Sequence, residues 1–410
     1  MTEFPKRVFS GIQPSGDIHI GNYLGAVKKW VEITEMHDSI FCIVDDHAIT
    51  VEYDNARLPG LTFEAALASM ACGLDPKKCT LFVQSHVPEH TELTWLFNTV
   101  VPLGSLFRMH QFKEKTRSAL HRAMTKKGGG AKASILHKLK GAGETALKLA
   151  KDLETDVTAL DPEGEADESL VARINDGLGN MMQNLQVGLG ASGSSTALLD
   201  YPVLQAADIL LYKANLVPVG EDQEQHLELC REVAERFNRK FSEIFPMAER
   251  VPGEATRILG LDGKQKMSKS LGNHIGVLDP KELVEKKLSR AFTDPNRVRK
   301  NDPGRPEVCN VFSLHGFFSS EENCSQIEVD CRAGKIGCFD CKMLLANGVN
   351  NRLQPIQDRS DALKQRPDEV FTALEEGAKR CREIAAETMD EVRSVMGLGH
   401  HALAEITKLS

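Results

Sequence analysis

The chain has 410 residues, 41% of them hydrophobic and 26% charged, which is enough for about two or three domains with cores of their own. A formal net charge of -8 excludes a uniformly basic nucleic-acid binder, so RNA must be contacted through local groups of Lys and Arg, and DNA is not an expected partner. No apolar run reaches the length of a membrane span, and a strand starts near residue 7, leaving no room for a signal peptide. We therefore expect a cytoplasmic protein with no membrane partner.

The first predicted elements are a strand at 7–10, a loop containing Gly11 and Gly16, and a helix that begins at His19 or Gly21. In such a βα unit the helix N-terminus faces the carboxyl end of the strand, where phosphate groups bind. His19 and Asn22 add two hydrogen-bonding side chains at the same point. This pattern favours a nucleotide site, although an ordinary α/β domain can begin in the same way.

The next predicted elements are a strand at 39–44, a helix at 61–72 and a strand at 80–84. Strands that alternate with helices at this spacing indicate a doubly wound parallel sheet with ligands at the carboxyl ends of its strands. Asp45, Asp46 and His47 follow the strand at 39–44 and are therefore candidate ligand contacts, although an Asp here is also a common helix cap.

A stretch of different composition follows the helix and basic turn predicted at 103–115. Residues 117–196 carry glycine-rich joints at both ends, helical patterns at 133–153 and 170–189, and an acidic stretch between these patterns. We interpret this stretch as an inserted helical pair on flexible hinges. A largely disordered insertion is the alternative.

The α/β pattern resumes with a helix at 201–212 and a short strand at 216–219. This strand leads to Gly220, Glu221 and Asp222, and a long helix follows through 226–237. Two carboxylates at this point are typical of a positive helix N-terminus. Asp222 is well placed to accept hydrogen bonds from ribose hydroxyls.

A second motif, Lys-Met-Ser-Lys-Ser at 266–270, lies among Gly260, Gly263 and Gly272. Two ammonium groups on a glycine-bordered loop suit a triphosphate from which pyrophosphate departs, because negative charge builds on the leaving oxygens. Beyond this motif the chain is mostly helical, with helices predicted at 280–290, 342–354 and 368–396. We expect an all-α domain whose last helix is long enough to pack against the first domain.

Together, HIGN near residue 20 and KMSKS near residue 268 resemble the paired signatures of class I aminoacyl-tRNA synthetases. The segments GIQPSG, HIGNYLGA, CIVDDHAIT, QFKEK, YPVLQAADILLY and VPVGEDQEQHLEL extend the resemblance to bacterial-type tryptophanyl-tRNA synthetases over almost the whole chain outside the insertion. The resemblance implies an α/β fold with a doubly wound, Rossmann-like parallel sheet in the catalytic domain, a helical insertion and an all-α C-terminal domain. The implied boundaries are 1–116 and 197–275 for the two halves of the catalytic fold, 117–196 for the insertion in the connective peptide, and 276–410 for the anticodon-binding domain. A homodimer is also implied.

The activity implied by this resemblance is activation of L-tryptophan with ATP, followed by transfer of tryptophan to tRNA(Trp). The in-line attack needs positioning and charge stabilisation but no covalent nucleophile. Mg²⁺ would be held mainly by the phosphates of ATP, so we expect no magnesium site built by the protein. The matching catalytic residues are His19, Asn22, Lys115, Lys266 and Lys269. The matching ATP-binding residues are Gln13, Pro14, Ser15, Gly21, Asn22, Gly220, Glu221, Asp222, Ile258, Lys266, Met267, Ser268, Lys269 and Ser270.

The amino-acid pocket must hold a flat apolar ring with one N–H donor, so it needs apolar walls and one acceptor. We assign the acceptor to Asp208, on the helix predicted at 201–212; a capping or salt-bridged role is the alternative. The resemblance places Phe9, His47, Val217 and Val219 around the ring, and Tyr201 and Gln223 at the α-amino group.

Three other functions share parts of this pattern. A tyrosyl-tRNA synthetase has the same fold and signatures but must satisfy a phenol that both donates and accepts a hydrogen bond. A HIGH-type nucleotidyltransferase that does not act on tRNA is disfavoured by GEDQ and the helical C-terminal domain. A synthetase-like binding protein without charging activity is disfavoured by the lysines at 115, 266 and 269.

Half of the ten cysteines fall between 309 and 341. Cys309, Cys331, Cys338 and Cys341 are spaced C-x21-C-x6-C-x2-C, and four thiolates suit either a tetrahedral zinc ion or a [4Fe–4S] cluster. The pattern resembles the iron–sulfur site of some tryptophanyl-tRNA synthetases, so a structural cluster is our first hypothesis, with zinc and unliganded thiols as alternatives. Arg332, Lys335 and Lys342 would then form a basic patch for anticodon phosphates.

Overall fold

The structure, a computed structural model, describes residues 6–14, 18–112, 114, 144, 195–220, 223–252, 258–269 and 271–399. The chain divides into two compact units, one made of Met1–Val101 with Pro202–Ser410 and the other of Pro102–Tyr201. The insertion predicted at 117–196 lies outside the described residues, apart from residues 144, 195 and 196.

The larger unit contains a parallel five-stranded sheet with the strand order β3-β2-β1-β4-β5. The strands are Arg7–Ile12 (β1), Asp38–Ile43 (β2), Thr80–Val83 (β3), Leu216–Val217 (β4) and Glu249–Arg250 (β5). β2 and β3 are buried along almost their whole length, as expected for strands covered on both faces. The predicted parallel sheet is confirmed. β4 is shorter than the strand predicted at 216–219 because Pro218 has no N–H for the ladder, and β5 was not predicted.

Short and medium helices connect these strands. In the first half of the sheet they are Ile20–Asn22 (α1), the π-helical turn Tyr23–Val27 (η1), Lys28–Ile33 (α2), Asp45–Ala48 (α3), Leu58–Ala71 (α4), the 3-10 turn Gln84–His86 (η2) and Glu89–Phe97 (α5). Leu103–Arg108 (α6) belongs to the smaller unit. Thr196–Leu211 (α10) begins in the smaller unit and continues into the larger one, where Glu224–Lys240 (α11) follows. The parallel strands thus alternate with helices, which places several strand ends and helix N-termini at one edge of the sheet.

The C-terminal part is helical, as predicted. Its elements are Lys281–Ser289 (α12), the 3-10 turn Pro306–Val308 (η4), Asn310–Phe318 (α13), Glu321–Arg332 (α14), Cys338–Lys364 (α15) and Pro367–Val395 (α16). α13 and α14 were not predicted. α14 buries only Ile327 fully, too little for a clear hydrophobic period. No described helix is both long and apolar enough to cross a membrane.

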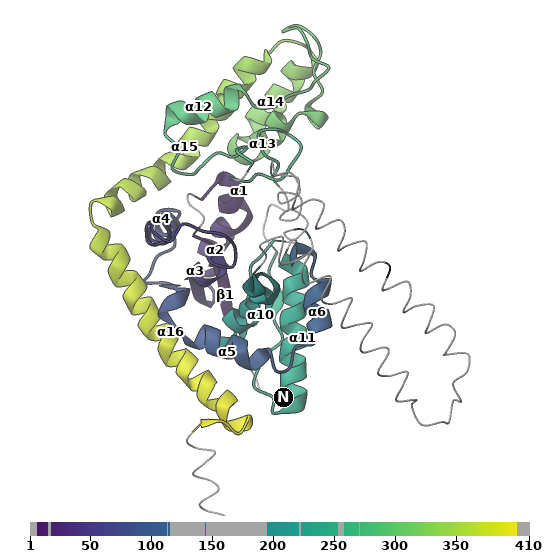
Figure 1. Cartoon of the computed structure of the whole chain (residues 1–410). Helices are drawn as coiled ribbons and strands as arrows, with labels where there is room; N and C mark the ends of the chain where they lie inside the picture. Colours follow the sequence, from purple (N-terminus) through teal and green to yellow (C-terminus); the bar gives the residue numbers. More distant parts are fainter. Residues whose placement is uncertain are drawn as a thin grey trace, which may run out of the picture. The chain divides into compact units, whose positions relative to one another are not determined.

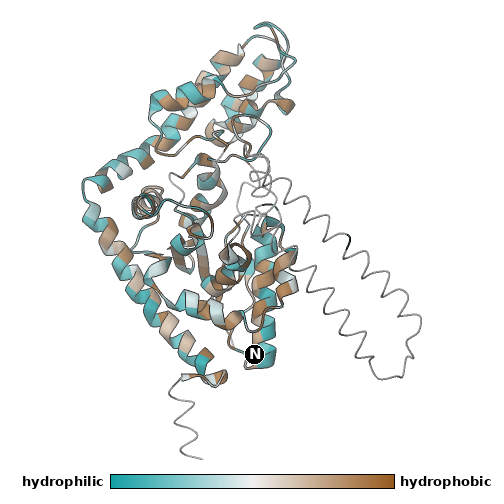
Figure 2. Cartoon of the chain, viewed as in Figure 1, coloured by the Kyte–Doolittle hydropathy of each residue, from teal (hydrophilic) through white to brown (hydrophobic). Residues whose placement is uncertain are grey.

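α16 packs along the edge strand β3 and also contacts α4 and α5 (Figure 1). Hydrophobic and hydrophilic residues alternate along this helix (Figure 2), and its buried face includes Val370, Leu374 and Met389. Polar contacts fix its position: Arg380 donates to Asp38 Oδ1 at 2.7 Å, and Arg393 forms a bidentate pair with Glu92. The last long helix therefore closes the sheet edge that β3 would otherwise expose.

Candidate active site

Two side chains at the N-terminus of α1 form hydrogen bonds with backbone N–H groups of the same turn. His19 is the N-cap of α1: its Nδ1 accepts from the backbone N–H of Asn22 at 3.2 Å, and the Asn22 side chain faces the backbone N–H of His19 in return. Because Nδ1 is an acceptor, the ring proton of a neutral His19 lies on Nε2, which can donate to a ligand.

The two signature motifs, about 250 residues apart in the sequence, lie together in the structure. The backbone N–H of Ile20 donates to Ile275 O at 2.9 Å, and His19 forms an antiparallel bridge with Gly276. A Cβ on Gly21 would lie 3.4 Å from Cβ of Met267. The KMSKS loop therefore lies beside the N-terminus of α1.

The pKa of His19 also indicates that the two motifs lie close together. Burial, followed by the charges of Lys269, His274 and Lys266, lowers the pKa of His19 to about 4. The imidazole is therefore neutral at pH 7, and the positive charge at this position comes from the two lysines of the KMSKS loop. A site of this type binds an anion by ammonium groups and a neutral N–H donor.

The KMSKS loop is held by one buried amide. Asn273 accepts from the backbone N–H of Ser268 at 2.8 Å and donates from Nδ2 to Asp262 at 2.9 Å. The backbone of Lys266 forms an isolated antiparallel β-bridge with that of Leu259. Asn310, the first residue of α13, donates to Gly260 O at 2.8 Å, which joins the base of this loop to the helical part of the chain.

The other residues predicted to bind ATP are only partly described. Gln13 is exposed and Pro14 is buried directly after β1, while Gly220 follows β4 and accepts from the backbone N–H of Gln223 at 3.0 Å. Ile258 is buried in the same hydrophobic cluster as Met267. Predicted site residues that lie outside the described residues are Ser15, Lys115, Glu221, Asp222 and Ser270.

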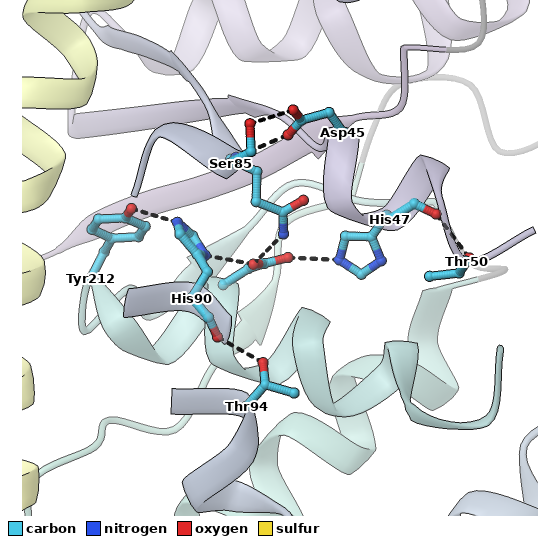
Figure 3. A network of polar contacts seen from close by, with 9 residues as sticks. Asp45, His47, Thr50, Ser85, His90, Thr94 and Tyr212 are labelled. Carbon is cyan, nitrogen blue, oxygen red and sulfur yellow. Dashed lines mark hydrogen bonds and ion pairs between the residues drawn. The ribbon is translucent and has the colours of Figure 1, made fainter. Parts of the chain in front are cut away.

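Asp208 on α10 is the centre of a buried polar network, whose members His47, His90 and Tyr212 are labelled in Figure 3. Its Oδ1 accepts from Gln84 Nε2 at 2.6 Å and pairs with His90 Nδ1 at 2.6 Å, and its Oδ2 pairs with His47 Nε2 at 2.8 Å. Burial alone would raise the pKa of Asp208, but the hydrogen bonds from His47 and His90 outweigh it and lower the pKa to about 2. A fully ionised carboxylate thus lies inside the protein, stabilised by three donors.

Of the remaining residues predicted to bind tryptophan, Phe9 contacts a member of this network. Phe9 on β1 stacks on Tyr212 with ring centroids 5.4 Å apart, and Val217 lies on the neighbouring strand β4. Val219 and Gln223 follow β4 and are partly buried. Tyr201 belongs to the smaller unit, where its hydroxyl donates to Gln111 Oε1 at 3.1 Å.

The sequence analysis missed three members of the Asp208 network. Gln84 directly follows β3, so the rule that selected Asp45 to His47 after β2 also applied to it. His90 is on α5, and Tyr212 directly follows α10. Neither of these two carries a sequence signal, because His90 meets Asp208 and Tyr212 only through contacts between residues about 120 positions apart in the chain.

The four predicted metal ligands lie close enough to influence one another. Burial and then the charges of Cys309, Cys331 and Cys338 raise the pKa of Cys341 to about 12. In the described part of the chain, however, no group of three or more His, Cys, Asp or Glu side chains is arranged to hold a metal ion. The predicted metal site therefore remains a hypothesis.

Arg297 contacts one of these thiols and the backbone of the loop between α14 and α15. Arg297 Nη1 donates to Cys331 Sγ at 3.6 Å, and its Nη2 donates to Ile336 O at 2.6 Å. Arg297 Nε is buried and has no hydrogen-bond partner within the described ranges. A Cβ on Gly304 would overlap Cys331 Sγ, so this position leaves room for the sulfur alone.

Of the residues predicted to form a basic patch, two are already paired. Arg332 forms salt bridges with Glu307 at 3.2 Å and Glu328 at 2.9 Å, and Lys342 donates to Ser289 O at 3.1 Å. The carboxylates offset the charge of Arg332, whereas Lys342 keeps its charge but has one of its donors occupied.

Comparisons with known proteins agree with this geometry. A family model for class I tRNA synthetases (W and Y) matches residues 1–127 and 176–354. The tryptophan–tRNA ligase of Deinococcus radiodurans is 42% identical over 396 residues, which cover 95% of this chain and 98% of the relative. That of Aquifex aeolicus is 39% identical over 411 residues, covering 96% of this chain and all of the relative.

Solved structures extend the match to three dimensions. The tryptophanyl-tRNA synthetase of Campylobacter jejuni, solved with ADP and tryptophan, has a TM-score of 0.70 and 29% identity, with 96% of this chain and 100% of that chain covered. A tyrosyl-tRNA synthetase from Archaeoglobus fulgidus, at 18% identity and a TM-score of 0.51, shares the fold. The family model covers well over half of the chain, both signature motifs meet at one edge of the parallel sheet, and the chain belongs to the class I tRNA synthetases (W and Y).

Proposed function

We propose that the protein is a tryptophan–tRNA ligase, which forms tryptophanyl-adenylate and pyrophosphate from L-tryptophan and ATP and then charges tRNA(Trp). The observation that carries the proposal is the position of His19 beside the charges of Lys266 and Lys269 at the N-terminus of α1, in the same compact unit as the buried carboxylate of Asp208 on α10. Relatives at 36–42% identity over nearly the whole chain are tryptophan–tRNA ligases.

ATP would bind with its phosphates between α1 and the KMSKS loop. His19 is neutral, so it donates a hydrogen bond from Nε2 without adding charge, and the ammonium groups of Lys266 and Lys269 counter the charge that builds on the departing pyrophosphate. Lys115 and Asn22 complete the proposed catalytic set. The remaining proposed ATP contacts are Gln13, Pro14, Ser15, Gly21, Gly220, Glu221, Asp222, Ile258, Met267, Ser268 and Ser270, with Mg²⁺ carried by the phosphates of ATP.

Tryptophan would bind with its indole N–H toward Asp208. The carboxylate is ionised and buried, so it accepts a hydrogen bond strongly and penalises any ring that lacks a donor. Phe9, His47, Val217 and Val219 are the proposed walls, and Tyr201 and Gln223 the proposed partners of the α-amino group. A tyrosine phenol can also donate to this carboxylate, but its oxygen needs a second group that donates to it, which an indole does not.

Amino-acid-dependent exchange of labelled pyrophosphate into ATP, measured with each of the twenty amino acids, tests the proposal. We expect tryptophan alone to support rapid exchange. Faster exchange with tyrosine than with tryptophan would contradict the assigned substrate. No exchange with any amino acid would contradict the assigned activity.

We further propose that the enzyme works as a homodimer in the cytoplasm, where protein synthesis takes place, with residues 117–196 as an appendage beside the dimer interface or the mouth of the active site. Light scattering on the purified protein should give about twice the mass of one chain. Replacing 117–196 with a short Gly/Ser linker should leave adenylate formation intact. Failure of that variant to fold would show that the segment belongs to the core.

A [4Fe–4S] cluster held by Cys309, Cys331, Cys338 and Cys341 is our proposal for the cysteine region. The proximity of the four thiols, three of which act on the pKa of Cys341, and the N–H···S contact from Arg297 support it. Such a cluster would act structurally, by fixing the loop between α14 and α15.

Anaerobic purification, visible absorption, and analysis of iron, sulfide and zinc separate the three possibilities. We expect a coloured protein with about four irons and four sulfides per chain. Stoichiometric zinc would replace the cluster with a tetrahedral site, and a colourless, metal-free protein with ten titratable thiols would leave these cysteines unliganded.

A further inference from the structure

The two carboxylate oxygens of Asp208 have different numbers of partners. Oδ1 has two, Gln84 Nε2 and His90 Nδ1, both at 2.6 Å, whereas Oδ2 pairs with His47 Nε2 at 2.8 Å. A carboxylate oxygen has two lone pairs in the plane of the group. Oδ1 is therefore saturated, and Oδ2 keeps capacity for one more donor.

An ionised Asp208 also decides where the protons of its partners lie. Because the carboxylate only accepts, His90 must carry a proton on Nδ1, and the Gln84 amide must present its NH₂ group. In a neutral His90 the other nitrogen, Nε2, is then an acceptor, and the Tyr212 hydroxyl lies 2.7 Å from it. His90 is thus held at both ring nitrogens, which fixes the plane of the ring.

This chain of contacts continues into the C-terminal helix. Tyr212 shares a hydrogen bond with Cys381 on α16, and His90, Tyr212 and Cys381 are all fully buried. Tyr212 also stacks on Phe9. With all of these groups removed from solvent, water cannot replace a lost partner, so each contact restricts its neighbour.

We propose that His90 is a positioning residue for tryptophan recognition: it holds Asp208 by Oδ1 so that Oδ2 faces the indole N–H. The proposal rests on the function proposed above. It predicts that His90 controls discrimination for the indole N–H specifically, although it does not touch the substrate itself. A purely structural role would lower stability or activity without changing this discrimination.

The test compares tryptophan with 3-benzothienylalanine, in which sulfur replaces the indole N–H. The kcat/KM ratio of the two amino acids in pyrophosphate exchange should favour tryptophan strongly in the wild type, and His90→Leu should reduce that ratio roughly 10- to 100-fold. The KM for ATP should change less than about threefold, because the lysine loop is not part of the network. His90→Asn, whose amide can donate from nearly the position of Nδ1, should recover most of the ratio.

Two further variants keep the test decisive if His90→Leu fails to fold. Tyr212→Phe leaves every contact of Asp208 in place but removes the partner of His90 Nε2, and should reduce the ratio by a smaller factor than His90→Leu. Thr94→Val is the matched control on α5: the Thr94 hydroxyl donates to His90 O and does not reach Asp208, so the ratio should stay at the wild-type value (Figure 3).

The outcomes distinguish this inference from the proposed function. A wild type that shows no tryptophan-dependent exchange overturns the proposed function. The wild type can instead activate tryptophan selectively while the folded His90→Leu and Tyr212→Phe variants have the same kcat/KM ratio as Thr94→Val. That result overturns the role of His90 and leaves the proposed function standing.

Discussion

Replacing Gly377 by alanine probes the contact that fixes α16 on the sheet. A Cβ added at this residue would lie 2.8 Å from the carbonyl carbon of Leu81 on β3 and closer still to its oxygen. The obstacle is strand backbone, which cannot rotate away as a side chain can. α16 would therefore have to move outward by about 1 Å to reach normal carbon contact distances.

The expected magnitude follows from two opposing effects. Overpacking of a well-packed contact costs about 1–3 kcal/mol, and the upper end applies because the strand cannot yield. Alanine in a helix gains about 1 kcal/mol over glycine. We expect the free energy of opening of α16 to fall by about 2 kcal/mol. This fall corresponds to roughly 30-fold weaker protection of its amides against hydrogen exchange.

Hydrogen exchange followed by mass spectrometry measures this loss directly, because it reports the opening of α16 and β3 separately from the rest of the chain. Gly60→Ala is the matched control: Gly60 lies in α4, and its Cβ would meet no atom within 4 Å, so this variant should be neutral or slightly stabilising. Equal or better protection of α16 in Gly377→Ala than in Gly60→Ala would refute the close-packing argument.

Three further predictions concern the site. Asn273→Ala should lower kcat for pyrophosphate exchange about 10-fold or more with little change in the KM for tryptophan, because the backbone of Ser268 loses its acceptor; unchanged kcat would contradict this role. Asn310→Ala should raise the KM for ATP several-fold by freeing Gly260 O, whereas Asn323→Ala on exposed α14 should not; equal effects of the two variants would show that the link is unimportant. The pKa of Asp208 falls from 3.8 to about 2 on folding, so its contribution of about 2 kcal/mol should be present above about pH 4 and lost as the pH falls toward 2; urea unfolding midpoints that stay constant over this range would argue against an ionised buried carboxylate.

Local sequence patterns were sufficient for much of the fold. The strands β1, β2 and β3 could be predicted because each is a short apolar run that ends in polar residues. The helix α16 could be predicted because its apolar residues recur at helical spacing over its 29 residues. The two signature motifs are also local, since phosphate binding needs particular residues at a particular spacing. The family and its fold class therefore followed from the sequence.

The contacts of Asp208 depended on the tertiary structure. The sequence pointed to Asp208 and His47, but the roles of Gln84 and His90 depend on contacts with Asp208 and Tyr212 across more than 110 residues of chain, and no local period records such contacts. The same holds for Gly377, whose missing side chain matters only because Leu81 lies against it. Hydrophobic periodicity specifies which face of an element is buried, whereas the partner of a buried polar group is decided by the packing of whole elements, because only that packing removes the competing water.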